Sequence, residues 1–248
     1  MKLLLFDVDG TICDSGKKIL PQMYNQLNLL ANTGYILGIV GGGTFNKILY
    51  QLDEKVRPEY IFSECGSVFH KLNFDINEYE LININNLRLE PEYSLINKLV
   101  KTCLKYIADT NYLVAGNFID LRNGLIYVSM VGMCATDEER ANFIVQDVIY
   151  EHRTKLIKIL KEHATELGIV NKIDICLGGS VGIAIYPSKW NKVQVLDWIE
   201  TNKFEEIHYF GDKYLFDGND YALINNPIIK GHPVDTLEQT LNILMKLQ

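Results

Sequence analysis

The chain has 248 residues, of which 48% are hydrophobic and 22% are charged, so it is long enough for one large or two moderate domains with a substantial core. This composition is typical of a soluble globular protein and excludes a disordered or fibrous chain. The net charge of -7 argues against nucleic acid as the main partner.

The cysteines and the N-terminal segment indicate the compartment. The five cysteines form no C-x-x-C pair and are odd in number, which favours a reducing compartment and no zinc site. The apolar run at residues 3–6 is interrupted by Asp7 and Asp9 before it reaches the length of a signal segment or a membrane span. We therefore expect a cytoplasmic protein with no membrane role.

The first predicted element is a strand over residues 2–6, which is followed by two carboxylates, Asp7 and Asp9, and a glycine, Gly10. Ligands in open α/β sheets bind at the carboxyl ends of strands, so these carboxylates lie where a site is expected. Asp7 is the candidate nucleophile, which would form an aspartyl phosphate, and Asp9 is the candidate proton donor and acceptor. The plain alternative is that Asp9-Gly10 only makes a turn.

Phosphoryl transfer to a carboxylate needs a divalent cation, because the carboxylate and the phosphate repel each other. Hard oxygen ligands suit Mg²⁺, so Mg²⁺ is the expected cofactor. An anionic substrate of this acidic chain would also need local positive groups.

The next elements alternate between helix and strand, which is typical of a parallel sheet. The pattern predicts a helix over residues 20–32, a strand over 35–40 and a helix over 45–52. The last helix is opened by a glycine turn that contains Gly42 and ends at Thr44, and backbone N–H groups in such a turn can bind phosphate. A tight turn and an N-cap need the same residues, so both readings of Gly42 and Thr44 stay open.

The sequence changes character between about residues 73 and 187. The predicted elements are, in order, a helix over 92–109, hairpin strands over 118–121 and 125–131, a long helical stretch over 136–167, and hairpin strands over 173–177 and 182–186. This order predicts an α+β layer inserted into the doubly wound core.

A second acidic cluster follows the apolar run at residues 207–210 and contains Asp212, Asp217 and Asp220. Two such clusters on one sheet could share one metal ion. The alternative is a solvated loop that opens a helix near residues 221–224, with Asn219 or Asp220 as its N-cap. Upstream, Lys192 could offer a positive charge to a phosphate, although a lone lysine is more often a surface residue.

These motifs, in this order, resemble those of the eukaryotic-type phosphomannomutases of the haloacid dehalogenase superfamily along nearly the whole chain. The matching stretches are Leu5-Phe6-Asp7-Val8-Asp9-Gly10-Thr11, Gly38-Ile39-Val40-Gly41-Gly42, Phe118-Ile119-Asp120-Leu121-Arg122-Asn123-Gly124, Asp137-Glu138-Glu139-Arg140, Gly178-Gly179, Tyr186-Pro187, Trp190-Asn191-Lys192, Phe210-Gly211-Asp212-Lys213 and Gly218-Asn219-Asp220. The first and last stretches are shared by the wider superfamily, and the middle ones are specific to the mutases.

The resemblance implies an α/β fold with a Rossmann-like haloacid dehalogenase core and an inserted α+β cap domain. The expected boundaries are core residues 1–80 and 188–248, and cap residues 81–187. The implied activity interconverts mannose 6-phosphate and mannose 1-phosphate through an aspartyl phosphate and a hexose bisphosphate, and serves GDP-mannose biosynthesis. A hexose 1,6-bisphosphate would be the activator, and the cap would mediate a homodimer.

The resemblance also implies residue roles in the core. Asp7 would be the nucleophile, Asp9 the general acid and base, and Lys192 a contact of the transferring phosphate. The metal ligands would be Asp7, the backbone carbonyl of Asp9, and Asp212, supported by the loop that contains Asp217 and Asp220.

The remaining implied roles concern the substrate. Gly42 and Thr44 would contact the transferring phosphate, and Gly179 of the Gly-Gly turn would contact the substrate in the cap. Arg122 and Arg140 would hold the other phosphate, a task that suits the planar guanidinium of arginine.

Several positions depart from the family pattern. The family carries polar or charged contacts where this chain has Gly16, Met133, Gly182 and Ala184, and it has a serine at Gly43 and often an asparagine at Cys65. The transfer residues are present, whereas the groups that recognise the sugar are fewer. This favours an alternative to the mutase, a Mg²⁺-dependent phosphatase of a phosphosugar or related small phosphate. A non-catalytic paralogue is a third and weaker alternative, because the chain retains Asp7, Asp9, Lys192 and Asp212.

Overall fold

The structure, a computed structural model, describes residues 1–216 and 218–247 and divides into two compact units. Residues 1–85 and 190–248 form the core unit, and residues 86–189 form the cap unit. The first boundary lies a few residues beyond the expected one at 80/81, because strand β5 (Glu78–Ile84) pairs along its length with strand β4 (Val68–Asn73) and so stays in the core unit. The second boundary lies at 189/190 rather than 187/188.

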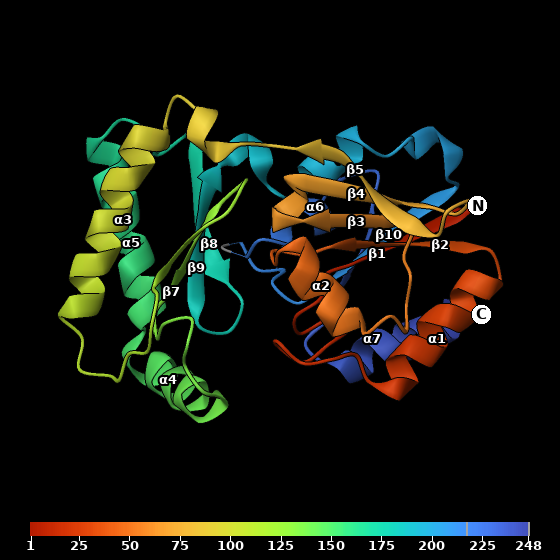
Figure 1. The fold of residues 1–248 in the computed structure, drawn as a ribbon, viewed down its shortest axis with the longest axis horizontal. Helices are drawn as coiled ribbons and strands as arrows, with labels where there is room; N and C mark the ends of the chain where they lie inside the picture. The colour runs from red at the N-terminus through yellow and green to blue at the C-terminus, as the bar shows by residue number, and fades with distance from the viewer. Residues whose placement is uncertain (217, 248) are drawn as a thin grey trace. The chain divides into compact units, whose positions relative to one another are not determined.

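The core unit is built on a seven-stranded sheet with the strand order β11-β10-β1-β2-β3-β4-β5 (Figure 1). The five strands from β11 to β3 are parallel, and β4 and β5 extend the sheet as an antiparallel hairpin. The bounds of the parallel strands are β1 (Lys2–Phe6), β2 (Tyr35–Val40), β3 (Tyr60–Ser63), β10 (Glu206–Gly211) and β11 (Lys230–Pro233).

Both faces of this sheet are covered, which explains why β1 reads as a continuous apolar run. Leu4 and Phe6 pack into one hydrophobic cluster, and Leu3 and Leu5 pack into another on the opposite face. The first cluster includes residues of helices α1 (Pro21–Asn32), α2 (Phe45–Leu52) and α7 (Leu237–Leu244), and the second includes Leu223 of helix α6 (Tyr221–Ile224).

Local sequence signals set the ends of the core helices. α1 begins with Pro21 at its first position, where the missing N–H costs no hydrogen bond. α2 begins after Thr44, whose hydroxyl accepts a hydrogen bond from the N–H of Lys47, and ends at Asp53 in the left-handed conformation. The predicted elements over residues 2–6, 20–32, 35–40 and 45–52 are thereby confirmed.

The cap unit has a four-stranded antiparallel sheet with the order β6-β7-β9-β8. Its elements are α3 (Tyr93–Ala108), β6 (Ile119–Leu121), β7 (Ile126–Ser129), α4 (Asp137–Tyr150), α5 (His152–Glu166), β8 (Ile173–Gly178) and β9 (Gly182–Pro187). The helix and the two hairpins predicted for this region are confirmed.

The predicted helical stretch over residues 136–167 consists of two helices rather than one. Thr136 and Glu139 form a capping box at the start of α4. Glu151 then adopts the left-handed conformation, with φ of 54°, and ends α4 before α5 begins at His152. Among the described residues, no helix combines the length and apolar character needed to span a bilayer.

Candidate active site

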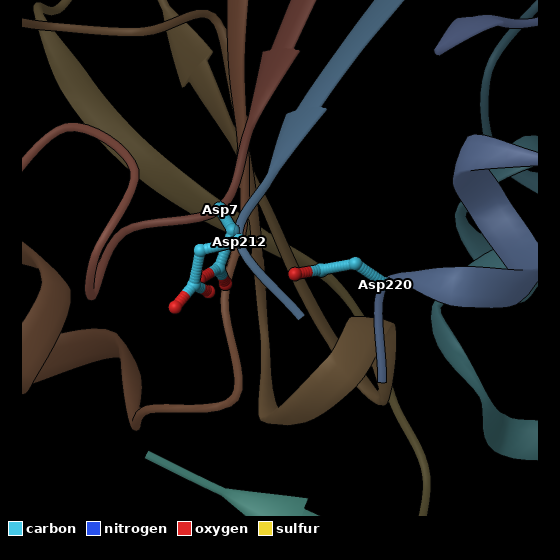
Figure 2. Close-up of side chains that lie close together, drawn as sticks. All are labelled: Asp7, Asp212 and Asp220. Atoms are coloured by element: carbon cyan, nitrogen blue, oxygen red, sulfur yellow. The ribbon is translucent and has the colours of Figure 1, made fainter. Parts of the chain in front are cut away.

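Three acidic side chains converge beyond the carboxyl ends of strands β1 and β10. These strands are parallel neighbours, and the N–H of Asp7 donates a hydrogen bond of 2.9 Å to the carbonyl of Phe210. Asp7 and Asp212 follow the two strands, and Asp220 immediately precedes α6 (Figure 2). One oxygen from each carboxylate lies within 4.8 Å of the others. The two acidic clusters of the sequence therefore meet at one point, as expected for strands of one parallel sheet.

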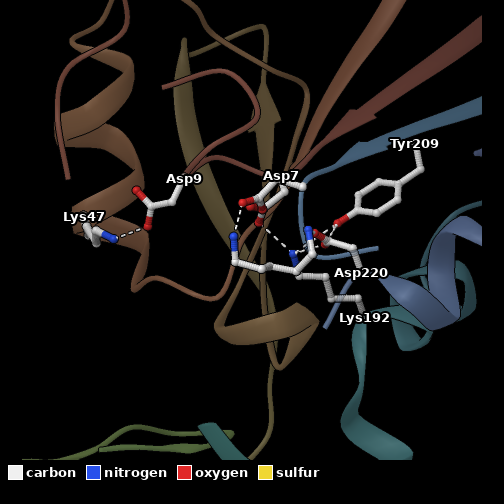
Figure 3. Close-up of polar contacts among 8 residues, drawn as sticks. Asp7, Asp9, Lys47, Lys192, Tyr209 and Asp220 are labelled. Carbon is white, nitrogen blue, oxygen red and sulfur yellow. Dashed lines mark hydrogen bonds and ion pairs between the residues drawn. The ribbon is translucent and has the colours of Figure 1, made fainter. Parts of the chain in front are cut away.

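Lys192 lies beneath this cluster and its side chain is fully buried. Its Nζ donates hydrogen bonds of 2.6 Å to Asp7 and 2.6 Å to Asp220, and one of 3.1 Å to the hydroxyl of Tyr209 (Figure 3). The Tyr209 hydroxyl in turn donates to Asp220. A buried charge needs paired and hydrogen-bonded neighbours, and Lys192 has them. The surface role that is usual for a lone lysine does not apply to it.

Burial and charge set the ionisation of these groups. Burial raises the pKa of Asp7 to about 7, the charge of Lys192 opposes the rise, and Asp220 and Asp212 add to it. Burial alone would lower the pKa of Lys192, but the negative charges of Asp220 and Asp7 have the larger effect and hold this pKa well above its ordinary value. Burial also raises the pKa of Asp212. The site therefore stabilises additional positive charge next to Asp7.

The carboxylate of Asp9 has partners of its own and is not part of this cluster (Figure 3). It pairs with Lys47 at 2.5 Å, and accepts hydrogen bonds from the side chain of Gln51 at 2.8 Å and from the N–H of Gly16 at 2.9 Å. Burial alone would raise the pKa of Asp9. The charge of Lys47 and the hydrogen bonds from Lys47, Gly16 and Gln51 have the larger effect together, so the pKa is lowered. The carboxylates of Asp7 and Asp9 therefore have separate partners.

Two glycines let the acidic loops approach so closely. A Cβ atom on Gly10, which has φ of 85°, would lie 2.5 Å from Oδ2 of Asp212. A Cβ atom on Gly211 would lie 2.5 Å from Cγ of Asp220. Any other residue at these positions would displace the two carboxylates.

The cluster has the donor chemistry of a Mg²⁺ site. All the converging groups are hard carboxylate oxygens, which Mg²⁺ prefers. Oδ1 of Asp212 and Oδ1 of Asn219 are buried and accept no hydrogen bond from the residues that the structure describes. A buried acceptor without a donor is costly, and a cation would satisfy it. Asp217, which the sequence also predicted as a ligand, lies outside the described residues.

The predicted phosphate contacts of the core lie on the turn between β2 and α2. Thr44 is the N-cap of α2, so its hydroxyl has the structural role that the sequence left open. A Cβ atom on Gly42 would lie 3.8 Å from the side-chain amide of Asn219 and 3.8 Å from the thiol of Cys65, which places this turn beside the second acidic loop.

The predicted substrate contacts of the cap lie on three different segments of this unit. Arg122 follows β6 and pairs with Asp120 at 2.7 Å, and Arg140 is half-buried in the first turn of α4. Gly179 lies in the turn between β8 and β9 with φ of 58°, and its carbonyl accepts a hydrogen bond of 3.1 Å from Arg153.

Some residues of the site were not predicted from the sequence. Lys47 and Gln51, which hold Asp9, are four residues apart on one face of α2, a spacing that could have indicated a shared partner. Tyr209, which binds Lys192 and Asp220, lies next to Phe210 in the apolar strand β10. Nothing in the sequence distinguishes it from an ordinary core residue.

The parallel sheet, the acid pair after its first strand and the second acidic loop are features of the haloacid dehalogenase fold. Solved structures with this fold include IMP-nucleotidase of Plasmodium falciparum, with a TM-score of 0.69 and 15% identity over 100% of this chain and 68% of that one. They also include the trehalose-6-phosphate phosphatase C-terminal domain of C. albicans, with a TM-score of 0.63 and 15% identity over 100% of this chain and 93% of that one.

Sequence comparison identifies the family. The family model described as eukaryotic phosphomannomutase matches residues 23–248. The phosphomannomutase of Arabidopsis thaliana is 34% identical over 96% of this chain and 93% of its own length, and that of Saccharomyces cerevisiae is 34% identical over 99% of this chain and 93% of its own length. The chain belongs to the eukaryotic phosphomannomutase family, which confirms the family that the sequence motifs indicated.

Proposed function

We propose that this protein is a Mg²⁺-dependent phosphosugar mutase that interconverts mannose 6-phosphate and mannose 1-phosphate. The observation that carries the proposal is the buried triad of Asp7, Lys192 and Asp220, with Lys192 2.6 Å from both carboxylates. The triad places a nucleophilic carboxylate beside a fixed positive charge at the carboxyl end of the first strand, where a phosphate can meet both.

The chemistry runs through Asp7 and Asp9. With Asp7 phosphorylated, Asp9 takes the proton of a hydroxyl of the hexose monophosphate, whose oxygen then attacks phosphorus and breaks the acyl phosphate bond. The contacts with Lys47 and Gln51 support this first step, because they orient the ionised carboxylate that accepts the proton. The product is the hexose bisphosphate, and Asp7 is free again.

The second half returns the phosphate from the other end of the sugar. The bisphosphate turns around, the carboxylate of Asp7 attacks its other phosphorus, and Asp9 gives its proton to the leaving sugar oxygen. Lys192 lies 2.6 Å from Oδ1 of Asp7 and stabilises the negative charge that gathers on the transferring phosphate. A hexose 1,6-bisphosphate would load Asp7 at the start, which makes it the activator.

The Mg²⁺ ion would be held by Asp7, the backbone carbonyl of Asp9, and Asp212, with Asp220 in the supporting loop. It would supply positive charge that offsets the repulsion between Asp7 and the phosphate. Lys213 pairs with Asp212 in the structure, so it is the group that this cation would compete with.

In the cap, Arg122 and Arg140 would hold the phosphate that is not being transferred. The support for Arg122 is its orientation, because its side chain is only 10% exposed and is fixed by Asp120. The planar guanidinium of arginine matches the geometry of phosphate oxygens.

The proposal is tested by following mannose 1-phosphate with ³¹P NMR in the presence of Mg²⁺ and catalytic glucose 1,6-bisphosphate. We expect mannose 6-phosphate to form at the expense of mannose 1-phosphate, with little inorganic phosphate. Chelation of Mg²⁺ and the variant Asp7→Asn should each abolish the conversion. Conversion by Asp7→Asn at the wild-type rate would rule out the mechanism.

A phosphatase of phosphosugars is the second candidate, and the cap supports it. Gly182 and Ala184 bring no polar side chain to β9, and Met133 lies exposed at a position where the family has a charged one. Weak contacts to the sugar would admit water to phosphorylated Asp7. The same NMR experiment separates the two candidates, because a phosphatase would release inorganic phosphate and form no mannose 6-phosphate.

We further propose that the protein forms a homodimer through its cap and works in the cytoplasm, where it supplies mannose 1-phosphate for GDP-mannose biosynthesis. The dimer is supported by an apolar stripe on α4, where the exposed fractions are 60% for Val145, 78% for Val148 and 65% for Ile149. A reducing compartment is supported by the five free cysteines.

A further inference from the structure

Tyr127 lies against the cap residues that were predicted to bind substrate, although nothing in the sequence pointed to it. Its ring centroid is 4.9 Å from the guanidinium carbon of Arg122. Its hydroxyl is 3.7 Å from the position that a Cβ atom on Gly179 would take. Tyr127 therefore connects the end of β6 to the turn between β8 and β9, and any substrate held by Arg122 and Gly179 would lie beside it.

The register of the cap sheet fixes the face on which Tyr127 lies. Tyr127 on β7 is paired with Asp120 on β6 and with Ala184 on β9. Paired residues of an antiparallel sheet point to the same side, so these three share one face. The neighbouring positions Ile126 and Val128 are buried and point to the other face.

Glycines make the room that the ring occupies. Gly178 and Gly182 are directly paired on β8 and β9, and the ring of Tyr127 lies across them. A Cβ atom on Gly182 would lie 2.3 Å from Cζ and 2.4 Å from the hydroxyl oxygen of Tyr127, and one on Gly178 would lie 3.1 Å from Cε2. The ring of Tyr127 therefore fills the space that a side chain at position 182 would need, and a residue larger than glycine there would displace the ring.

This arrangement determines which side chains of the cap can contact a sugar. On this face Gly182 and Ala184 offer no polar side-chain atom, Asp120 pairs with Arg122, and the hydroxyl of Tyr186 lies 3.4 Å from the thiol of Cys176. Tyr127 carries a hydroxyl beside Gly179, a group that can donate and accept hydrogen bonds. On these grounds we infer that Tyr127 is the sugar-contacting residue of the cap and determines which hexose phosphates bind. The inference rests on the proposed function, since it assigns the sugar contact of that same site.

Tyr127 can also be read as a purely structural residue, because an aromatic ring that covers paired glycines stabilises a sheet. The variant Tyr127→Phe separates the two roles. It keeps the ring over the glycines and removes only the hydroxyl. If Tyr127 is only structural, Tyr127→Phe binds hexose phosphates as the parent protein does. If its hydroxyl contacts the sugar, the variant binds them more weakly.

The test measures binding by calorimetry in the Asp7→Asn background with Mg²⁺, where no turnover occurs. The ligands are mannose 1-phosphate, glucose 1-phosphate and glycerol 3-phosphate, which carries a phosphate without a sugar ring. Loss of one hydrogen bond to the sugar should weaken the hexose phosphates by about tenfold in Tyr127→Phe. Glycerol phosphate should bind as before, and the thermal midpoint should not move. Tyr93→Phe on α3 is the matched control and should change nothing.

The contact between the Tyr127 ring and position 182 is tested by a double-mutant cycle in the Asp7→Asn background. Gly182→Ala alone should weaken hexose phosphate binding, because its methyl group displaces the ring. Added to Tyr127→Ala, it should have no further effect, since the ring is already gone.

The outcomes separate the two claims. If neither hexose phosphate binds to the Asp7→Asn protein, the proposed function fails and this inference fails with it. If both bind and Tyr127→Phe binds them with unchanged affinity, the proposed function stands and Tyr127 is not the sugar contact. Equal weakening of glycerol phosphate would also overturn the inference, because it would place the hydroxyl at the phosphate instead.

Discussion

Lys192 illustrates how much of this site depends on single buried charges. It has no exposed surface, and its ammonium group is shared between Asp7 and Asp220. Removal of one partner from a buried ion pair leaves the others without compensation, which costs more than the pair itself contributes. Lys192, which we propose contacts the transferring phosphate, is therefore expected to stabilise the fold as well.

The variant Lys192→Met is predicted to lower the free energy of unfolding by about 3 to 5 kcal/mol, because two carboxylates stay buried without their cation. Urea denaturation followed by circular dichroism measures this. Lys189→Met is the control, since Lys189 is 62% exposed in its pair with Glu90 and should contribute less than about 1 kcal/mol. Equal stability of Lys192→Met and the wild type would contradict the account.

The contacts of Asp9 lead to a second prediction at this scale. Lys47→Met removes the ion pair that orients Asp9, so we expect kcat to fall by about tenfold or more while KM changes little. Steady-state mutase kinetics test this, with Lys55→Met as a control on the segment that follows α2. A variant with wild-type kcat would show that Lys47 does not position Asp9.

Individual residues also show where sequence reasoning stops. The positions of Asp7 and Asp212 could be predicted because each directly follows a recognisable strand, and that of Asp9 because it lies two residues beyond Asp7. The partners of Asp9 could not, because Lys47 and Gln51 are about forty residues away and only the packing of α2 brings them close. The contact of Tyr127 with Gly182 depends on strand register, which local sequence does not specify.

At the scale of elements, the elements with strong local signals were the ones predicted. Strand β1 is apolar on both faces, and α2 has a threonine cap, so each could be located from its own residues. The hairpin of β4 and β5 was not predicted because β5 is mostly exposed and its alternation of polar and apolar residues is broken where Ile82 follows Leu81. The break between α4 and α5 was missed because it occurs at Glu151, which is not a residue type that usually adopts the left-handed conformation.

The paired strands β10 and β11 carry a pH-sensitive contact. His208 and His232 stack and are hydrogen-bonded at 2.8 Å, and burial, followed by the charges of His208 and Lys230, lowers the pKa of His232 to about 4. Between pH 6.5 and about 4 the unfolded chain therefore binds a proton at His232 that the folded chain does not. Stability is lost as the pH falls through this range.

We predict that the free energy of unfolding, measured by urea titration at a series of pH values, falls between pH 6.5 and about 4 with a slope that is smaller in His232→Gln. The comparison of slopes removes the contribution of the other titrating groups. An identical slope in the variant would show that His232 titrates alike in the folded and unfolded states.

At the scale of the whole molecule, the proposed dimer depends on the apolar stripe of α4. Val148→Glu puts a charge in the middle of this stripe and should convert a dimer into monomers, because a buried unpaired charge is costly. Sedimentation velocity measures the change, and Leu81→Glu on β5, another exposed apolar position, is the control. A dimer that survives Val148→Glu would locate the interface elsewhere.

The central claim is that phosphorylated Asp7 gives its phosphate to one end of a hexose phosphate and then takes a phosphate back from the other end. The most direct measurement incubates the protein with Mg²⁺ and ³²P-labelled glucose 1,6-bisphosphate, traps the labelled protein in acid, and then adds mannose 1-phosphate to a parallel sample. We predict acid-stable label on the peptide that contains Asp7, and its transfer to mannose bisphosphate and mannose 6-phosphate. Label that never appears on Asp7, or that leaves only as inorganic phosphate, would contradict the mutase.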